Sequence, residues 1–248
     1  MQLVGHTILI TGGSEGIGLA LAKALAPNNT VIICGRSADK LARAESVLPK
    51  ALIEVCDITN ADERNQLVER VLRKYPNLNI LMNNAGSRHR VDLRGGDDIE
   101  SALYSDLFIN YVAPVSLSDK LLKHLQGQPR AAIVNVTTGL VYLPKAAQPF
   151  YCAAKAALHS YTRSLRWVLQ DSSVRVFEVL MTLVDTNFHQ GELPGTLKAM
   201  SPDEAARLTV EGILRDREEI HIGKAALARW VALVAPGMGM AFVNNEPH

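Results

Sequence analysis

The amino-acid sequence predicts an α/β fold with a doubly wound, mostly parallel sheet of about seven strands and helices on both faces. Three observations predict it. Short runs of apolar and β-branched residues alternate along the chain with longer amphipathic segments. These runs are nearly continuous in apolar character, as expected for parallel strands covered on both faces. No linker rich in glycine, serine or proline divides the chain, so residues 1–248 are predicted to form a single domain.

Six strands can be located from their apolar runs, each of about four to eight residues. They are Thr7–Ile10, Thr30–Cys34, Ala51–Val55, Ile80–Asn83, Ala132–Val136 and Val174–Leu180. The segments between them have the spacing of helices with one apolar face. These helical segments are Gly18–Leu25, Lys40–Leu48, Ala61–Lys74, Ala102–Gln126 and Pro149–Gln170. Right-handed crossovers then place the helices on both faces of the sheet.

The last quarter of the chain is less regular. Residues 187–200 contain two glycines and a proline with little periodicity, and we expect a mobile flap there, near the substrate. Ser201-Pro202 is typical of a helix start, because serine caps free N–H groups and proline fits the first turn. The tail at 224–248 is apolar, and we expect it to pack over the substrate cleft or against a neighbouring subunit.

Charge and cysteine content exclude several classes of protein. The chain has 26 basic and 25 acidic residues, so it has no overall positive electrostatic potential that would attract nucleic acid or an anionic membrane. Cys34, Cys56 and Cys152 are too few and too widely spaced for a disulfide framework or a zinc site, and we expect buried free thiols. The sequence before the first strand leaves no room for a signal peptide, and no apolar run reaches the ~20 residues of a membrane span. We therefore expect a reducing compartment, the cytoplasm in a bacterium.

A glycine-rich loop follows the first strand directly and opens the first helix. Glycine permits a tight turn and close backbone approach, and a helix N-terminus offers free N–H groups to an anion. An ordinary strand-to-helix turn is the alternative, but the alternation of strand and helix favours the pyrophosphate of a nucleotide. The residues expected to contact it are Gly12, Ser14, Glu15, Gly16, Ile17 and Gly18.

The end of the second strand bears on which nucleotide binds. A carboxylate there would bind the adenosine ribose of NAD and repel a 2′-phosphate. Gly35 supplies no carboxylate, and Arg36, followed by Ser37, supplies a guanidinium suited to phosphate. Arg36 as a solvated loop charge is the alternative, and Glu15 places a negative charge in the same region. We expect NADP as the cofactor, with NAD as the second choice.

Polar and small residues follow the third and fourth strands. Asp57 could accept a hydrogen bond from the adenine amino group with Ile58 beside the ring. It could also cap the helix that begins near Asn60 or Ala61, and both roles could hold at once. The segment Asn83-Asn84-Ala85-Gly86 ends the fourth strand. Its small residues would let the backbone approach a ribose, while its amides would tie neighbouring strands together.

Tyr151 and Lys155 are four residues apart at the head of a helical segment, so their side chains share one face. An ammonium near a phenol favours the phenolate and lowers its pKa from ~10, which suits proton exchange with a carbonyl or alcohol oxygen. A tyrosine and a lysine at this spacing often occur on a protein surface by chance, without a functional role. The surroundings of this pair favour a site: Thr138 ends the fifth strand, at the sheet edge where ligands bind. Asn110 lies mid-helix, where asparagine is either a buried polar tie or a site residue.

These motifs, in this order, resemble those of the short-chain dehydrogenases/reductases. The resemblance runs from His6 to about Gly223. It implies a Rossmann-type fold and an NAD(P)-dependent oxidoreductase that interconverts a carbonyl and a secondary alcohol. Within the family, the sequences at Cys34–Ser37, Tyr75–Asn79 and Tyr151–Ser160 are similar to DltE-type oxidoreductases of bacteria. The motifs that carry the resemblance are Thr11-Gly12-xxx-Gly16-x-Gly18, Asn83-Asn84-Ala85-Gly86, Asn110, Thr138, Tyr151-xxx-Lys155 and Val184-Asp185-Thr186.

The resemblance implies a role for each matching residue. Tyr151 would be the general acid/base, and Lys155 would lower its pKa while holding the nicotinamide ribose. Thr138 would hydrogen-bond the substrate oxygen, and Asn110 would hold a water in a proton relay through Lys155. The contacts to the nicotinamide carboxamide would come from Val184 and Thr186.

Two positions depart from the family pattern. Thr138 stands where most members have serine, and its extra methyl group stiffens the rotamer and narrows the pocket. Met181-Thr182 stands where Pro-Gly is common, beside the nicotinamide face. These departures favour, as an alternative function, an NADP-binding sensor or scaffold with weak or no catalysis. Because the chain retains both Tyr151 and Lys155, the enzyme remains the leading hypothesis.

The partner expected besides a small carbonyl or alcohol substrate is a second copy of the chain. Members of the family usually associate through two long helices, which correspond to Ala102–Gln126 and Pro149–Gln170 here. Large apolar side chains on these segments include Phe108 and Trp167. Burial within one subunit explains them equally well, so a homodimer or homotetramer is an expectation from the family alone.

Overall fold

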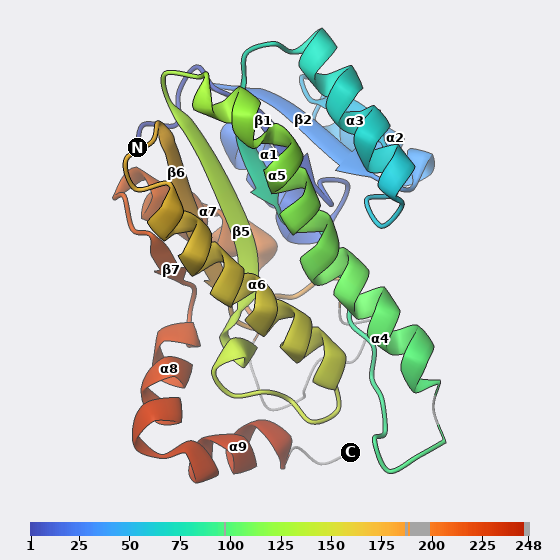
Figure 1. Ribbon diagram of the computed structural model, residues 1–248, viewed down its shortest axis with the longest axis vertical. Coiled ribbons are helices and arrows are strands. Elements are labelled where there is room, and N and C mark those ends of the chain that lie inside the picture. Colours follow the sequence, from blue (N-terminus) through green and yellow to red (C-terminus); the bar gives the residue numbers. More distant parts are fainter. Residues whose placement is uncertain (97, 187, 189–198, 246–248) are drawn as a thin grey trace.

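The computed structural model describes residues 1–96, 98–186, 188 and 199–245, which form a three-layer α/β arrangement around one sheet (Figure 1). In these residues the sheet has seven strands, in the order β3-β2-β1-β4-β5-β6-β7, and every neighbouring pair is parallel. The predicted doubly wound parallel sheet is therefore confirmed. The strands are β1 (Thr7–Thr11), β2 (Thr30–Gly35), β3 (Leu52–Val55), β4 (Leu78–Asn83), β5 (Ala131–Thr138), β6 (Val174–Met181) and β7 (Glu219–His221).

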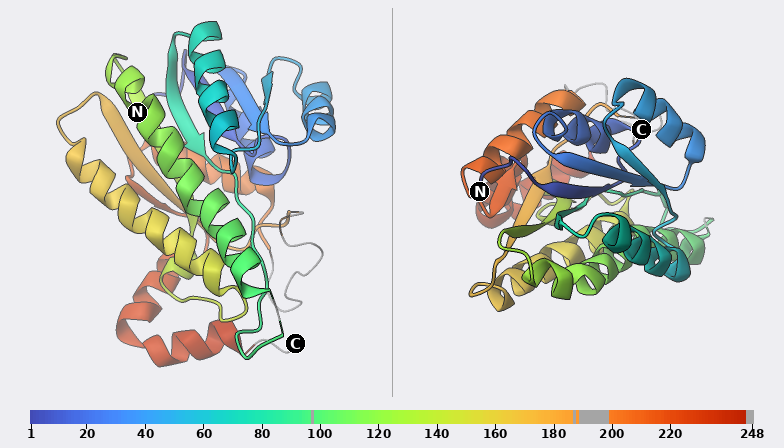
Figure 2. Two further views of the ribbon diagram at one scale, coloured as in Figure 1. Left: turned by 45° about the vertical axis from the view of Figure 1, so that its right-hand side comes forward. Right: turned by 90° about the horizontal axis from the view of Figure 1, so that it is seen from above.

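Helices cover both faces of the sheet, as the view from above shows (Figure 2). One apolar cluster joins the sheet to α1, α2 and α7, and a second joins its other face to α3, α5 and the end of α6. Burial of apolar side chains on both faces explains why the strands read as continuous apolar runs. The helices are α1 (Gly16–Leu25), α2 (Ala38–Val47), α3 (Ala61–Lys74), α4 (Ile99–Leu107), α5 (Ala113–Gln126), α6 (Pro149–Val168), α7 (Pro202–Leu214), α8 (Ala225–Val234) and α9 (Pro236–Asn244).

The strand order reverses its direction at β1. The chain moves outward from β1 to β2 and β3, then returns to place β4 on the other side of β1. Loops that leave β1 and β4 at their carboxyl ends therefore diverge, and such a reversal opens a crevice that α/β proteins use to bind ligands. The glycine-rich loop and the Asn83–Gly86 segment both lie at this point.

The predicted helix at Ala102–Gln126 is interrupted. A π-helical turn, Phe108–Val112, separates α4 from α5. Pro114 has no N–H to donate to the carbonyl of Asn110 four residues earlier, so regular α-helical bonding fails at this turn. The Asn110 side chain in turn donates to the carbonyl of Asp106, 2.9 Å away. A continuous helix was the wrong expectation, and π-turns of this kind often mark functional sites.

Strand β7, like the helices α8 and α9, was not located from the sequence. It has three residues, Glu219–His221, and two of them are polar, so neither length nor apolar pattern distinguishes it from a loop. Its register against β6 pairs Ile220 with Val179.

Ser201 caps α7 as predicted, since its hydroxyl accepts from the Glu204 N–H.

The C-terminal residues described form two short helices, α8 and α9, beneath the start of α6 (Figure 1). Of the predicted flap at 187–200, only residues 188, 199 and 200 are described, so the flap itself lies outside the described residues.

Among the helices described, none has the length and apolar character needed to cross a membrane. All three cysteines are buried and free, as expected.

Candidate active site

A cleft of about 2210 Å³ opens at the carboxyl edge of the sheet. Its walls come from the glycine-rich loop, the loops after β2, β3, β4 and β6, the segment from β5 into α6, and the helices α8 and α9. Every residue that the sequence predicted for the site lines this cleft except Asn110, which is fully buried behind it. The tertiary structure thus brings together residues that are up to 174 positions apart, from Gly12 to Thr186.

The glycine-rich loop is shaped by backbone requirements at Gly12 and Gly16. Both have positive φ, +66° and +56°, a region that residues with a Cβ rarely adopt. Gly18 is needed for a different reason, because a Cβ there would collide with the carbonyl oxygen of Gly12. Asn84 fastens the loop by donating to the carbonyls of Thr11 and Gly12, at 3.0 and 3.3 Å. The first helix has no side-chain cap at Glu15, so it presents its N-terminal N–H groups to the cleft.

The far end of the cleft lies beside the end of β2. Arg36 is exposed there, and Ser37 caps α2 by accepting from the Lys40 N–H at 3.3 Å. The carboxylate of Glu15 accepts from the Lys40 ammonium at 2.5 Å. Glu15 therefore has a cationic neighbour, and the repulsion that the sequence suggested between Glu15 and a phosphate is offset by Lys40.

The structure tests one of the two roles considered for Asp57, that of a helix cap. Asn60 caps α3, since its side chain accepts from the N–H groups of Asp62 and Glu63. Asp57 instead accepts from the N–H and hydroxyl of Thr59, at 2.9 and 2.7 Å, and faces the cleft beside Ile58. The expectation that Asp57 caps the helix is wrong, because Asn60 occupies that position.

Tyr151 and Lys155 lie on one face of α6, and both are buried, with 8% and 4% of their surface exposed. The Lys155 ammonium donates to the carbonyl of Val136 at 2.8 Å. Burial lowers the pKa of Lys155 to about 8, because a charged amine is poorly solvated in the interior. Burial likewise raises the pKa of Tyr151 well above its ordinary value, and a hydrogen bond from the Thr138 side chain only partly opposes this. The sequence-based expectation was a Tyr151 pKa lowered by Lys155; in this structure burial raises that pKa, and the groups that oppose the rise are Thr138 and Arg88.

Asn110 contacts the site from behind. Its Nδ2 donates to the carbonyls of Ser87 and Asp106, at 2.8 and 2.9 Å. Its Oδ1 is buried and has no hydrogen-bond partner among the described residues. A Cβ on Gly86 would lie 2.8 Å from this oxygen and 3.7 Å from the Lys155 nitrogen, so the three groups are close neighbours. An unsatisfied buried acceptor beside an amine is a place where a bridging water fits.

The two departures from the family pattern both lie in the cleft. Thr138 is the last residue of β5, and its hydroxyl accepts from the Leu140 N–H at 3.3 Å. Met181 ends β6 with 5% exposure and lines the cleft. Thr182 packs against Gly223, whose φ is +57°. Beyond them, Val184 forms an isolated bridge with Met200.

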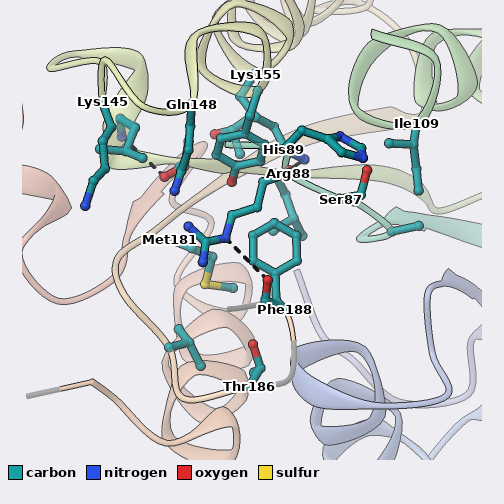
Figure 3. Close-up of a pocket in the computed structure, with 18 of the residues that line it drawn as sticks. Ser87, Arg88, His89, Ile109, Lys145, Gln148, Lys155, Met181, Thr186 and Phe188 are labelled. Atoms are coloured by element: carbon teal, nitrogen blue, oxygen red, sulfur yellow. Dashed lines mark hydrogen bonds between the residues drawn. The ribbon is translucent and has the colours of Figure 1, made fainter. Parts of the chain in front are cut away.

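Several residues of the cleft were not identified from the sequence. Gln148 is 3% exposed, precedes Tyr151 by three residues, and points into the cleft (Figure 3). Within the described part of the chain, its side-chain amide has no hydrogen-bond partner. Arg88 also enters the cleft: its Nε donates to the Phe188 carbonyl at 3.3 Å, and its guanidinium lies 5.9 Å from the Phe188 ring (Figure 3). The Phe188 ring is in turn 5.8 Å from the Tyr151 ring. The position of Gln148 one turn before Tyr151 was the one signal that could have identified it.

Comparison with known proteins gives consistent matches. A family model for short chain dehydrogenase matches residues 6–195. A relative in Bacillus subtilis (strain 168), named uncharacterized oxidoreductase DltE, is 42% identical over 224 residues, which are 89% of each chain. Among solved structures, a short chain dehydrogenase from Burkholderia cenocepacia in complex with NADP has a TM-score of 0.85 at 23% identity, covering 98% of this chain and 99% of its own. One from Burkholderia phymatum in complex with NAD has a TM-score of 0.85 at 19% identity, covering 100% and 98%. The solved structures show that the fold is shared.

Proposed function

The chain belongs to the short-chain dehydrogenase family of oxidoreductases, and on this premise we propose that it interconverts a carbonyl and a secondary alcohol with NADP(H). The observation that carries the proposal is the common position of Tyr151, Lys155 and Thr138 beside a cleft that also holds the glycine-rich loop. A proton donor, a cation and a second hydroxyl are the groups that carbonyl reduction needs at the reacting oxygen.

The cleft residues suit a dinucleotide along its whole length. We assign the pyrophosphate to the glycine-rich loop and the free N–H groups of α1, and the adenine to Asp57 and Ile58. Arg36, with Ser37 beside it, would bind a 2′-phosphate, and the ion pair between Glu15 and Lys40 supports NADP over NAD. The remaining contacts of the ribose and nicotinamide are assigned to Asn84, Ala85, Gly86, Tyr151, Lys155, Val184 and Thr186. When bound, the nicotinamide supplies or accepts the hydride.

The chain's own residues move the proton. Tyr151 donates its hydroxyl proton to the carbonyl oxygen on reduction and takes it back on oxidation. Thr138 donates a hydrogen bond to the same oxygen and orients it. The Lys155 ammonium stabilises the phenolate that Tyr151 becomes, which is necessary because burial disfavours that anion. A water held by the Asn110 Oδ1 would resupply protons through Lys155.

The substrate end of the cleft combines an apolar wall with a few polar groups. Leu143, Ala228 and Phe242 contribute apolar surface from the loop before α6 and from α8 and α9. Gln148 and Arg88 offer hydrogen-bond donors within the same space (Figure 3). Such a pocket suits a mainly apolar carbonyl compound with a second polar group.

The test is turnover with NADPH and a panel of ketones and aldehydes, followed through the loss of reduced-nicotinamide absorbance. Tyr151→Phe should reduce kcat by about 100-fold or more, since it removes the proton donor. Tyr161→Phe is the matched control, because Tyr161 lies on the same helix outside the cleft. Undiminished turnover in Tyr151→Phe would exclude this mechanism, and tight NADPH binding without turnover on any substrate would favour the sensor or scaffold.

We also propose that the protein is a homodimer or homotetramer. Large apolar side chains are exposed on α4, on the π-helical turn and at the end of α6, where Trp167 is 74% exposed. Burial of this surface against a second copy would remove it from water. A mass near 27.0 kDa by light scattering, which is that of one chain, would contradict the proposal.

A further inference from the structure

Two successive residues near the end of β5 each bind a charged side chain. The carbonyl of Val136 accepts from the Lys155 ammonium at 2.8 Å. The hydroxyl of the next residue, Thr137, donates to the carboxylate of Glu178 at 2.6 Å. The residue after that, Thr138, faces the cleft. Glu178 is therefore hydrogen-bonded to the end of β5 that carries Thr138 into the cleft, although Glu178 does not line the cleft itself.

Glu178 lies on β6 with no exposed surface. A buried carboxylate is costly unless hydrogen-bond donors surround it. Besides Thr137, the donor here is His159, whose Nδ1 lies 2.9 Å from each carboxylate oxygen. His159 follows Lys155 by four residues on α6, so the histidine and the lysine occupy adjacent turns of one helix face.

The rest of the shell around Glu178 comes from other elements. The Tyr142 ring meets the His159 ring edge-on, with centroids 5.8 Å apart, and the Tyr142 hydroxyl lies 3.2 Å from Nε2 of His221 on β7. Burial raises the pKa of Tyr142 to about 12 and lowers the pKa of His221, so both stay neutral around pH 7. Glu219, opposite Glu178 in the sheet, is surrounded by cations: it lies 3.3 Å from Arg229 and 3.9 Å from both Arg163 and Arg166.

We propose that Glu178 is a positioning residue: it is the buried counter-charge that keeps the Lys155 amine in its charged form, and His159 holds Glu178 in place. The inference rests on the function proposed above for Lys155. A buried ammonium loses its proton readily unless an anion lies near it. Burial already lowers the pKa of Lys155 to about 8, and Glu178 is the charged group that opposes this fall. Gly86 and Asn110, which lie near the Lys155 amine, contribute no negative charge. The carbonyl of Asp106 accepts from Asn110, but the Asp106 carboxylate is paired with His89, whose Nδ1 is 2.8 Å away.

Glu178→Gln tests the proposal, because the amide keeps the size of the side chain and can still accept from Thr137. Without the negative charge, Lys155 loses its proton at lower pH. The pH above which NADPH affinity and kcat decline should therefore fall by about one pH unit. At the acid end of the profile, where Lys155 stays charged in both proteins, the variant should approach the wild type. NADPH fluorescence measures the affinity without requiring turnover.

Glu54→Gln is the matched control. Glu54 is another buried strand glutamate, 4% exposed, but it pairs with Arg70 and Lys74 and does not line the cleft. Its substitution should lower the melting temperature without moving either pH profile. A shift of the same size in Glu54→Gln would mean that loss of stability, and not the charge of Glu178, causes the effect.

Two substitutions at His159 test the same chain of contacts without touching Glu178. His159→Asn keeps a nitrogen donor near the carboxylate. The pH above which NADPH affinity and kcat decline should stay within about 0.3 pH units of the wild-type value. His159→Leu removes the donor that holds the carboxylate in place, and the pH at which affinity and kcat decline should shift in the same direction as in Glu178→Gln. These variants decide the question if Glu178→Gln does not fold.

Unchanged pH profiles in both Glu178→Gln and His159→Leu would overturn the proposal. This outcome differs from failure of the proposed function, in which the wild type binds NADPH but reduces no carbonyl compound. In that case the pH profile of NADPH affinity alone still tests whether Glu178 controls the charge of Lys155.

Discussion

The ammonium of Lys40 lies 2.5 Å from the carboxylate of Glu15 and so joins the start of α2 to the glycine-rich loop. Both side chains are about half exposed, with 45% and 43% of their surface accessible, and such a pair contributes little to stability. Its consequence is for ligand choice. The negative charge of the glycine-rich loop is balanced where the adenosine ribose of a dinucleotide would lie, which leaves Arg36 as a further cation at the mouth of the cleft.

Arg36→Ala should therefore separate NADPH from NADH. A charge-assisted hydrogen bond to phosphate contributes about 1.5–3 kcal/mol, so the Kd for NADPH should rise by about 10- to 100-fold while that for NADH changes little. Fluorescence titration with each cofactor measures this. Arg43→Ala, an exposed arginine on α2 outside the cleft, is the control. Equal weakening for both cofactors would indicate that Arg36 does not contact a 2′-phosphate.

Substitution of Thr138 should distinguish its hydroxyl from its methyl group. Thr138→Val keeps the shape and removes the hydrogen bond to the reacting oxygen, so kcat should fall by about 10- to 100-fold. Thr138→Ser keeps the hydroxyl and removes the methyl group, so bulkier ketones should gain relative to small ones in kcat/KM. Steady-state kinetics on a size series of ketones checks both. Equal activity in the valine and serine variants would show that the hydroxyl has no role.

The alkaline side of the wild-type pH profile should report Lys155. Its pKa of about 8 lies below the ordinary value, so the ammonium is fully present only below that pH and disappears as pH rises through it. NADPH affinity and kcat should accordingly decline above about pH 8. Lys155→Met, which has no titrating amine, should bind NADPH weakly with no such decline. If the decline above about pH 8 persists unchanged in this variant, it must come from the titration of another group.

Gln148→Leu should affect the substrate and not the cofactor. The amide lies in the cleft one turn before Tyr151, and leucine has a similar size but no polar group. For a carbonyl compound with a second polar group, KM should rise by about 5- to 10-fold, while the Kd for NADPH stays the same. A ketone without such a group should show no change in KM. Equal effects on both substrates would place Gln148 in a structural role.

The order of strands and helices could be predicted because buried parallel strands have an unambiguous pattern. Six strands fall where their apolar runs lie, and α3 spans Ala61–Lys74 in both the prediction and the structure. Strand β7 and the π-helical turn at Asn110 could not be predicted. Glu219–His221 pairs with β6 only through tertiary contact, and the π-helical turn places the Asn110 side chain against the Ser87 carbonyl, 23 positions away, a contact that no local pattern marks.

Candidate site residues could be identified where a motif marks them. The glycine-rich loop, Arg36 and the Tyr151–Lys155 pair all carry spacing that has a chemical reason. No motif in the sequence identifies Glu178, because it is a single acidic residue within the largely apolar strand β6. No motif identifies Arg88 either, because its place in the cleft depends on how loops far apart in sequence come together, and Gln148 has only its position one turn before Tyr151.

The sequence by itself determined the parallel sheet, the position of the nucleotide loop and the pair of residues expected to move a proton, because each depends on local spacing. The tertiary structure alone decided the electrostatic setting of that pair. Burial raises the pKa of Tyr151 and lowers that of Lys155, and the only way to know this is to see which atoms surround them. It also brought Glu178, with His159 bonded to it, to the same end of β5 as Lys155. The charge that a buried group experiences depends on distance through the fold and not on separation along the chain.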